Sequence, residues 1–520
     1  MKILSFKSGH DGAVAGVDAP KQHLMFSYEA EKDSLPRNSP IDPNTLLDAG
    51  LWFNELPDVL ALSGWSTPGE SHTAISGAGS FGIDESTAIV GTKNFFGKRL
   101  DYYSSSHERS LIWAAYGLSP FEQGEPCYVL VWDDALGDFY EIDRNLKIHH
   151  MGRVLAAPGR RFSFLYALAD PSFSGTDNTP GKEFSSKLQS ASAHGEANVI
   201  DGDAQGLIDA LLQNGADSGF LNKEAFKNSP YYNIGVTSPR FHNLAARYSD
   251  AVFSRFHDFA KANLTKRYPL LITGECGLNY RWNTRWRDSG LFRDVFIPPC
   301  TNDSGSAIGT AVDAMRHFTG RAKLDWTVYA GQPFNDDRVD MQGVTSRELN
   351  LREVAQALHD GMVIGWVMGN CEIGPRALGN RSILAAPFSN ETRDRVNRIK
   401  GRAGLAPVSP VCLEDDVSNH FDWSGPSPHM LHFQQVTNPN LRAVSHVDGS
   451  ARVQTVTKDQ NAMLYDLLTE FKATSGVGVL CNTSLNFKRS GFINKTSDLY
   501  KFARSVGLDG FVAGRSFYRL

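Results

Sequence analysis

The first residues of the chain, Met1-Lys-Ile-Leu-Ser-Phe-Lys-Ser-Gly-His-Asp-Gly-Ala-Val-Ala-Gly-Val17, place two short apolar runs on either side of a polar turn. Apolar runs bounded by Gly, Ser and Asp predict β-strands, here at residues 2–6 and 13–17, with a third strand at 24–28. Glycine in such a turn lets backbone N–H groups approach phosphate oxygens, and a nearby Asp can hold a metal bound to them. The chain therefore opens on a hairpin suited to binding phosphate.

Two later turns repeat this arrangement. Predicted strands at 126–132 and 138–142 flank Asp133-Asp-Ala-Leu-Gly137, and a strand at 269–273 runs into Gly274-Glu-Cys-Gly277. Any one of them is typical of ordinary hairpins, because Gly and Asp are common turn residues. The three in this order favour an ATP-binding fold of the actin and sugar-kinase type.

Helical spacing of apolar residues separates these strands. It predicts helices at residues 105–116, 243–262 and 307–318. A polar, irregular stretch at 326–347 then precedes another helix at 351–360 and a strand at 362–367. We predict a mixed α/β protein with one domain over 1–340 and a second over 345–520.

Composition excludes several classes of protein. The net charge of the 520 residues is −5, which argues against nucleic acid or an anionic membrane as the main partner. No apolar run is long enough for a transmembrane helix, and the N-terminus does not resemble a signal peptide. The six scattered cysteines form no C-x-x-C pair and are typical of reduced thiols, so we expect a cytoplasmic protein.

Histidine and aspartate residues suggest a catalytic and metal site in the first domain. His10, beside Asp11 in the first turn, has a side chain whose pKa suits a general base, although a lone turn histidine is often only a surface residue. His107, Asp133 or Asp134, and Asp303 form a plausible ligand set for a divalent metal. Asp303 could equally cap the helix that follows it.

The C-terminal part is rich in arginine. Arg376, Arg381 and Arg452 lie in turns of small residues, as expected of phosphate ligands. Arg393, Arg395 and Arg398 instead fit a solvated helix face.

Seven motifs carry a resemblance that runs in order along nearly the whole chain. They are Gly9-His-Asp-Gly-Ala13, Lys187-Leu188 with Ala193-His-Gly195, Thr273-Gly-Glu-Cys-Gly-Leu-Asn279, Asn302-Asp-Ser-Gly305, Gly374-Pro-Arg-Ala-Leu-Gly-Asn-Arg-Ser-Ile-Leu384, His446-Val-Asp-Gly-Ser-Ala-Arg-Val-Gln-Thr455 and Asn482-Thr-Ser-Leu-Asn486. The chain resembles the O-carbamoyltransferases of antibiotic and nodulation-factor biosynthesis. The segments Phe6–Ala13, 29–33 and 491–494 are most similar to the branch that carbamoylates hydroxymethyl-cephems.

The resemblance implies two domains and a two-stage reaction. The first domain would be an actin-like ATPase-superfamily (Kae-like) carbamoyl-transfer domain, and the second a YrdC-like α/β domain that forms an adenylate. Carbamoyl phosphate would be hydrolysed, and the carbamate would attack ATP, bound with Mg²⁺, to give carbamoyl-adenylate. In the first domain Fe²⁺, or another divalent metal, would position the adenylate for attack by a small-molecule alcohol.

The resemblance also assigns residues. His10 and Asp11 would be catalytic, and His107, Asp133 and Asp303 would bind the metal. The nucleotide-binding residues would be Lys187, Gly274, Gly277, Asn279 and Asn302. The ligands of carbamoyl phosphate and ATP would be Arg376, Arg381, Lys400, Arg402, Arg452, Asn482 and Ser484.

This chain departs from the family pattern in three places. Leu111 stands where a second histidine is usual, one helical turn after His107, so Glu108 or water would have to replace that ligand. Ala406 stands where an arginine is common. The turn after residue 132 is longer or shifted, which leaves open whether Asp133 or Asp134 binds the metal.

Three alternative functions remain on sequence grounds. They are carbamoylation of a macrolide or polyketide hydroxyl, threonylcarbamoyl transfer to tRNA, and a role as an inactive actin-like nucleotide-binding regulator. The acidic net charge weighs against the tRNA substrate. The sequence leaves the oligomeric state open, a homodimer included.

Overall fold

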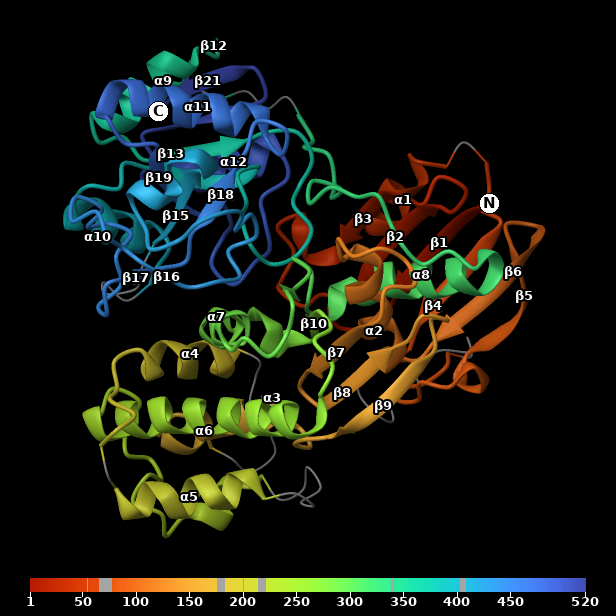
Figure 1. Ribbon diagram of the computed structural model, residues 1–520. Coiled ribbons are helices and arrows are strands. Elements are labelled where there is room, and N and C mark those ends of the chain that lie inside the picture. Colours follow the sequence, from red (N-terminus) through yellow and green to blue (C-terminus); the bar gives the residue numbers. More distant parts are fainter. Residues whose placement is uncertain are drawn as a thin grey trace. The chain divides into compact units, whose positions relative to one another are not determined.

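The computed structural model describes residues 1–53, 55–64, 77–174, 183–199, 201–213, 221–337, 341, 343–402 and 408–520. Figure 1 shows a mixed α/β chain, as predicted. It divides into two compact units: unit 1 comprises Met1–Leu118 and Asn302–Leu520, and unit 2 comprises Ser119–Thr301. These divisions differ from the expected domain boundary at 340–345, which stays a prediction.

A six-stranded sheet in unit 1 begins with the predicted hairpin. Its strands lie in the order β3-β2-β1-β4-β6-β5. They are β1 (Lys2–Lys7), β2 (Ala13–Asp18), β3 (His23–Glu29), β4 (Val59–Ser63), β5 (Ile89–Phe95) and β6 (Lys98–Ser105). The first three strands are antiparallel neighbours, whereas β4 pairs in parallel with both β1 and β6. Helix α1 (Pro43–Gly50) follows β3 in the chain.

Two closely packed helices lie beside this sheet, α2 (His107–Leu118) and α8 (Ser306–Thr319). Glycine allows the close approach, because a Cβ added at Gly309 would lie 1.7 Å from the Ser110 carbonyl oxygen. The buried Arg109 guanidinium also donates to both carboxylate oxygens of Asp313, at 2.9 and 2.8 Å. Helix α2 begins at 107 and not at the predicted 105, since Ser105 still pairs with Ser63 of β4.

All strands of the eight-stranded sheet in unit 1 come from residues 345–520. Its order is β12-β21-β20-β13-β14-β19-β15-β18. The strands are β12 (Thr345–Glu348), β13 (Ile364–Val367), β14 (Arg381–Ala385), β15 (Ser409–Leu413), β18 (Gln454–Val456), β19 (Val479–Ser484), β20 (Gly510–Ala513) and β21 (Ser516–Arg519). A two-residue pair, β16 (Gln434–Gln435) and β17 (Ser450–Ala451), lies outside it.

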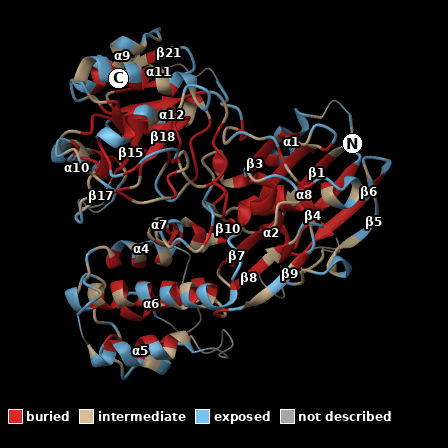
Figure 2. Cartoon of the chain, in the orientation of Figure 1, coloured by how far each residue is buried: buried red, intermediate tan, exposed pale blue. Residues whose placement is uncertain are grey.

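Side chains on the two faces of this sheet pack in two separate hydrophobic cores. Val367 packs in one core with residues of α10 (Asn390–Ile399) and α12 (Thr496–Val506). Ile364 and Trp366 pack in the other core with α9 (Leu351–His359) and α11 (Ala462–Ser475). Successive strand residues point to opposite faces, so the inner strands β13, β14 and β15, which have helices on both faces, are buried and drawn in red in Figure 2. The edge strand β12 is exposed.

In its described residues, unit 2 combines a sheet with the α-helices α3 to α7. The sheet order is β11-β10-β7-β8-β9. The strands are β7 (Cys127–Trp132), β8 (Gly137–Ile142), β9 (Ile148–Arg153), β10 (Leu270–Thr273) and β11 (Val295–Phe296), and the helices are α3 (Pro158–Ala169), α4 (Glu183–Ser192), α5 (Gly202–Leu212), α6 (Pro239–Asn263) and α7 (Tyr280–Asp288). The buried ring of Trp132 stacks on Trp282 at 4.4 Å, directly before the second predicted turn.

Among the described helices, none has the length and hydropathy needed to cross a membrane.

Candidate functional site

The first candidate site is a histidine–carboxylate cluster in unit 1, formed by His10, Asp11, His107 and Asp303. Asp11 has a positive φ of 53°, so the turn after β1 folds back sharply. Gly12 is required there, because a Cβ would meet the Ile41 nitrogen at 2.3 Å. His107 is the first residue of α2, and Asp303 opens the short 3-10 turn before α8. The two packed helices therefore bring His107 and Asp303 to the turn that carries His10.

The Asp303 carboxylate lies between the two imidazoles. Its Oδ2 is 3.3 Å from His10 Nδ1, and its Oδ1 is 3.7 Å from His107 Nε2. His10 Nε2 is 3.6 Å from Asp11 Oδ2, and one donor atom each of His10, Asp11 and Asp303 lies within 4.8 Å of the others. Imidazole and carboxylate donors suit Fe²⁺, Zn²⁺ or Mn²⁺, so His107 and Asp303 fit the divalent metal that the sequence predicts, and His10 and Asp11 lie next to them.

Leu111 stands where the family usually has a second histidine ligand, and Glu108 is the side chain that could replace it. Leu111 is fully buried in α2, and an apolar side chain supplies no ligand atom. Glu108 Oε2 accepts a hydrogen bond from the Gly82 N–H at 2.8 Å.

The turn after β7 in unit 2 distinguishes its two aspartates. Arg160 donates to the Asp134 carboxylate at 2.8 Å, which gives Asp134 a structural partner. Asp133 is 2% exposed, and its backbone N–H donates to the Leu136 carbonyl at 2.7 Å, which closes the turn. The assignment of Asp133 as a metal ligand stays a prediction.

The second candidate site is a basic cluster in unit 1, made by Arg37, Lys400, Arg402 and Arg452. Lys400 follows α10, and its ammonium donates to the Ser484 carbonyl at 2.5 Å, to the Ser484 hydroxyl at 3.2 Å, and to Asn486. Arg452 donates to the Ser409 hydroxyl at 3.0 Å. Lys400 and Arg402 lie two residues apart at the end of α10, whereas Arg452 comes from a segment 50 residues further along the chain and acts electrostatically on Arg402.

The cations of this cluster repel one another. Desolvation, followed by repulsion from Arg402 and Arg37, lowers the pKa of Lys400 well below its ordinary value. Desolvation, followed by repulsion from Arg452 and Arg37, lowers the pKa of Arg402 to about 10. Like charges raise each other's energy, so a bound anion would stabilise this cluster.

Arg37 was not predicted from the sequence. Residues 34–37 run antiparallel to 489–492, with hydrogen bonds from Ser34 N–H to the Phe492 carbonyl at 2.9 Å and from Gly491 N–H to the Leu35 carbonyl at 2.8 Å. This pairing brings Arg37 beside the basic cluster from more than 350 residues away in sequence. No local signal marks Arg37, since it lies in a polar loop with no motif of its own.

The remaining C-terminal predictions lie around one turn, residues 372–380, which we call the Arg376 turn. Arg376 is half-buried in it. Arg381 is fully buried, and its guanidinium donates to the Met368 carbonyl and to Asn494, both at 2.7 Å. The Asn482 amide donates to the Ala377 carbonyl at 3.1 Å. In this structure Arg381 and Asn482 hold the turn by internal contacts. Ala406 lies outside the described residues.

The predicted nucleotide residues of unit 2 lie on α4 and around the turn after β10. The Lys187 ammonium lies 4.7 Å from the centre of the Phe184 ring. Gly274 has a φ of +93°, and a Cβ there would meet the Trp132 carbonyl oxygen at 2.5 Å; Gly277 packs equally tightly on Thr301. Asn279 caps α7 and accepts a hydrogen bond from Gln189 at 3.0 Å. Asn302, in unit 1, accepts one from Ser304 at 3.2 Å.

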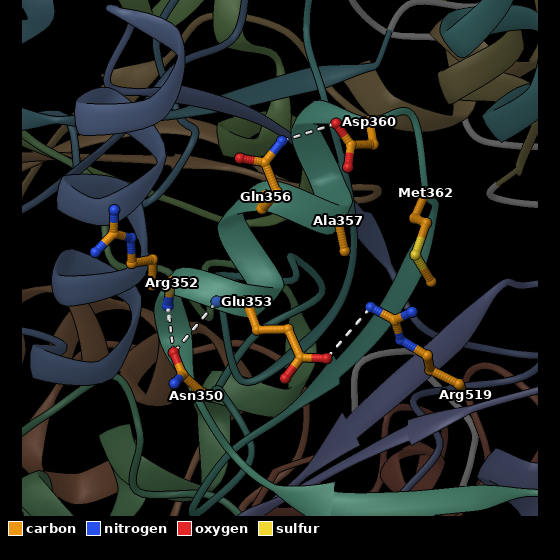
Figure 3. A pocket seen from close by; sticks show the side chains of 8 residues that line it. All are labelled: Asn350, Arg352, Glu353, Gln356, Ala357, Asp360, Met362 and Arg519. Atoms are coloured by element: carbon orange, nitrogen blue, oxygen red, sulfur yellow. Dashed lines mark hydrogen bonds and ion pairs between the residues drawn. The ribbon is translucent and has the colours of Figure 1, made fainter.

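A pocket of about 450 Å³ lies elsewhere, on α9 (Figure 3). Its polar side chains largely satisfy one another: Arg519 pairs with Glu353 at 3.3 Å, and Gln356 donates to Asp360 at 2.8 Å. None of the predicted site residues lines it.

Two family models and several known proteins match this chain. The family model "Carbamoyltransferase N-terminus" matches residues 83–312, and "Carbamoyltransferase C-terminus" matches 355–519. A 3'-hydroxymethylcephem-O-carbamoyltransferase of Amycolatopsis lactamdurans is 45% identical, and one of Streptomyces clavuligerus 42% identical, each over 100% of this chain and 99% of its own length. Nodulation protein U of Bradyrhizobium diazoefficiens is 31% identical over 95% of this chain and 93% of its own.

Solved structures give a much weaker likeness. A ROK family glucokinase from Streptomyces griseus covers 61% of this chain and 100% of its own, with a TM-score of 0.28 and 12% identity. An archaeal actin homolog gives a TM-score of 0.29 and 10% identity over the same shares. Scores this low carry no argument about the fold.

Proposed function

The chain belongs to the carbamoyltransferase family and is an enzyme that transfers a carbamoyl group; from this premise we propose that it carbamoylates the hydroxyl of a hydroxymethyl-cephem antibiotic intermediate, using carbamoyl phosphate and ATP. The names of the two relatives with above 40% identity support the cephem acceptor. The basic cluster is the observation that carries the proposed donor chemistry, because it gathers positive charge as phosphate binding requires.

The proposed reaction has three balanced steps. Water cleaves carbamoyl phosphate into carbamate and inorganic phosphate. A carbamate oxygen attacks the α-phosphate of ATP, which releases pyrophosphate and leaves carbamoyl-adenylate. The acceptor hydroxyl then attacks the carbamoyl carbon, the bond to AMP breaks, and the hydroxyl proton is lost.

The C-terminal residues are suited to the first two steps. Lys400, Arg402 and Arg452 would bind phosphate oxygens of carbamoyl phosphate and ATP, with Arg37 adding a fourth positive charge. Arg376 would bind from its turn, and Ser484 would complete the cradle with its hydroxyl. Arg381 and Asn482 would act by holding that turn in place.

The histidine–carboxylate cluster is suited to the last step. His10 would accept the proton of the acceptor hydroxyl, and Asp11 and Asp303, at 3.6 and 3.3 Å, would orient its ring. His107 and Asp303 would hold a divalent metal such as Fe²⁺, and Asp133 is the proposed third ligand. Such a metal, when bound, supplies positive charge for the phosphate of the leaving AMP. Lys187, Gly274, Gly277, Asn279 and Asn302 would line the nucleotide.

A mass-spectrometric assay tests this function. The purified protein is incubated with carbamoyl phosphate, ATP, Mg²⁺ and Fe²⁺ in parallel with a 3'-hydroxymethyl-cephem, a macrolide alcohol, and tRNA with threonine. We expect the cephem alone to gain one carbamoyl group. Modification of the macrolide or of tRNA instead would replace the proposed acceptor, and no modification in any arm would contradict the proposed reaction.

A further inference from the structure

A buried ion pair in the N-terminal segment, Glu29 and Lys32, forms hydrogen bonds with the Arg376 turn. Glu29 ends β3, and Lys32 ends the 3-10 turn that follows (Ala30–Lys32). Both side chains are nearly inaccessible, at 3% and 1% exposed, and Lys32 Nζ lies 3.4 Å from Glu29 Oε2. These residues lie more than 340 positions from the turn in sequence.

Both members of the pair bind the same residue, Gly374. The Gly374 N–H donates to Glu29 Oε1 at 2.5 Å, and Lys32 Nζ donates to the Gly374 carbonyl at 2.5 Å. Gly374 has a φ of +84°, and Arg376 is two residues further on. The pair therefore fixes the N–H and the carbonyl of the residue at which the chain bends into the Arg376 turn.

The opposite end of the turn is held separately. Glu372 is fully buried, and its Oε1 accepts hydrogen bonds from the N–H groups of Leu378 and Asn380, both at 2.7 Å. The Arg376 side chain thus projects from a turn that is fixed on both sides. The strand after the turn, β14, pairs Ser382 with Ser484, next to the basic cluster.

Stability alone does not account for such a pair. Replacing a buried ion pair by apolar residues is often neutral or stabilising, because two charges must be desolvated to form it. Its distinctive effect is geometric, since two charged hydrogen bonds fix one peptide segment where looser packing would let it shift. A displacement of about 1 Å in a binding group can cost a large factor in reactivity.

We propose that Glu29 and Lys32 are positioning residues for carbamoyl phosphate binding: they hold Gly374, and through it the Arg376 side chain, in the geometry that binds the anion. This inference rests on the proposed function, because it takes Arg376 to be an anion ligand. By this inference, a segment within the first forty residues contributes to the site that binds carbamoyl phosphate next to the C-terminal sheet.

Calorimetric titration of the full-length protein with carbamoyl phosphate tests this inference. Lys32→Met keeps most of the side-chain length without the charge, and Glu29→Gln keeps the shape. We expect the Kd to rise about tenfold in Lys32→Met and by a smaller factor in Glu29→Gln. Because the pair acts as a unit, the double variant should bind no more weakly than Lys32→Met.

A matched control separates positioning from stability. Lys472→Met removes a lysine that lies 2.9 Å from the buried carboxylate of Asp416 in the same unit. It should lower the melting temperature and leave the Kd unchanged. The inference is overturned if both Glu29→Gln and any folded Lys32→Met protein bind within about twofold of wild type. If Lys32→Met does not fold, Glu29→Gln decides. If the wild type binds no carbamoyl phosphate, the proposed function falls, and this inference falls with it.

Discussion

Asp303 is the residue on which the proposed transfer step depends most. Each of its carboxylate oxygens faces a different imidazole, that of His10 or that of His107. Removing the carboxylate would take from His107 its acidic neighbour, would leave His10 with Asp11 alone, and would delete a proposed metal ligand. We assign Asp303 a role only in the last step, the transfer to the acceptor hydroxyl, because we assign adenylate formation to the basic cluster.

We therefore expect Asp303→Ala to lower alcohol carbamoylation about a hundredfold or more while leaving carbamoyl-phosphate-dependent ATP–pyrophosphate exchange within about twofold. Asp325→Ala is the matched control, because Asp325 also lies near a histidine, His23 at 3.5 Å, but is 85% exposed. Loss of both activities in Asp303→Ala, or of neither, would refute this division of labour.

Arg452 is the corresponding residue for the first stage. Its side chain is anchored to Ser409 and contributes to the electrostatic field at Arg402. Arg452→Ala should reduce ATP–pyrophosphate exchange about a hundredfold, because a charge-assisted phosphate contact is lost. Arg398→Ala, at an exposed position of α10, should leave exchange unchanged. Normal exchange in Arg452→Ala would make that arginine merely structural.

The pKa of Lys400 gives a test by pH. Its folded-state pKa is depressed, so between that value and the ordinary 10.5 the unfolded chain binds more protons, and the free energy of unfolding rises with pH in this window. A bound anion would raise the pKa of Lys400 again, because its negative charge favours the charged ammonium. Carbamoyl phosphate binding in this pH window should therefore take up protons.

Titrations in two buffers of different ionisation enthalpy measure this proton uptake. We expect uptake of a fraction of a proton by the wild type and a clearly smaller uptake by Lys400→Met. Equal uptake in the two proteins would assign the protons to another group.

At the scale of elements, the crossing of α2 and α8 sets the geometry of the histidine–carboxylate cluster. The crossing tolerates no side chain at Gly309. Gly309→Ala should destabilise the protein by about 1–3 kcal/mol, because the helices must separate. Gly206→Ala on α5 adds a Cβ into open space and should instead be neutral or stabilising by up to about 1 kcal/mol. Urea unfolding of both variants measures the difference, and equal stability of the two would contradict the close packing.

The elements also show what the sequence could and could not predict. The hairpin β1–β2 and the strands β7 and β10 were predicted within one or two residues, because their apolar runs end at Gly and Asp turns. Helix α6 begins at Pro239, four residues before the predicted start, since Ser238 and Pro239 form its N-terminus. Parallel pairing of β4 with β1 and β6 had no local signal, because it depends on contacts between distant segments.

Site residues divide in the same way. His10 and Asp303 stood out because His10 lies in a glycine-containing turn and Asp303 opens a helix after a strand, whereas Lys400 was assigned only through the family resemblance. Within unit 1, Asp303 lies 3.3 Å from His10 and 3.7 Å from His107, and the roles assigned to these residues stay predictions. Arg37, Glu29 and Lys32 gave no such indication of a role at the C-terminal site, because pairing of residues 34–37 with 489–492 is a property of the folded chain alone.

At the scale of the whole molecule, unit 1 joins the two ends of the chain. Its residues come from Met1–Leu118 and from Asn302–Leu520, so both candidate clusters belong to one compact body. The first forty residues contribute His10 to one cluster and Arg37 to the other. We infer that the N-terminal segment serves both stages of the proposed reaction.

In the proposed reaction, one carbamoyl-adenylate is formed and consumed for each alcohol that is modified. The direct measurement is the nucleotide balance of the complete reaction, with AMP, ADP, pyrophosphate and carbamoylated product quantified in the same sample. We expect one AMP and one pyrophosphate per product, with no product when ATP is left out. Carbamoylated product formed without ATP, or with ADP in place of AMP, would contradict it.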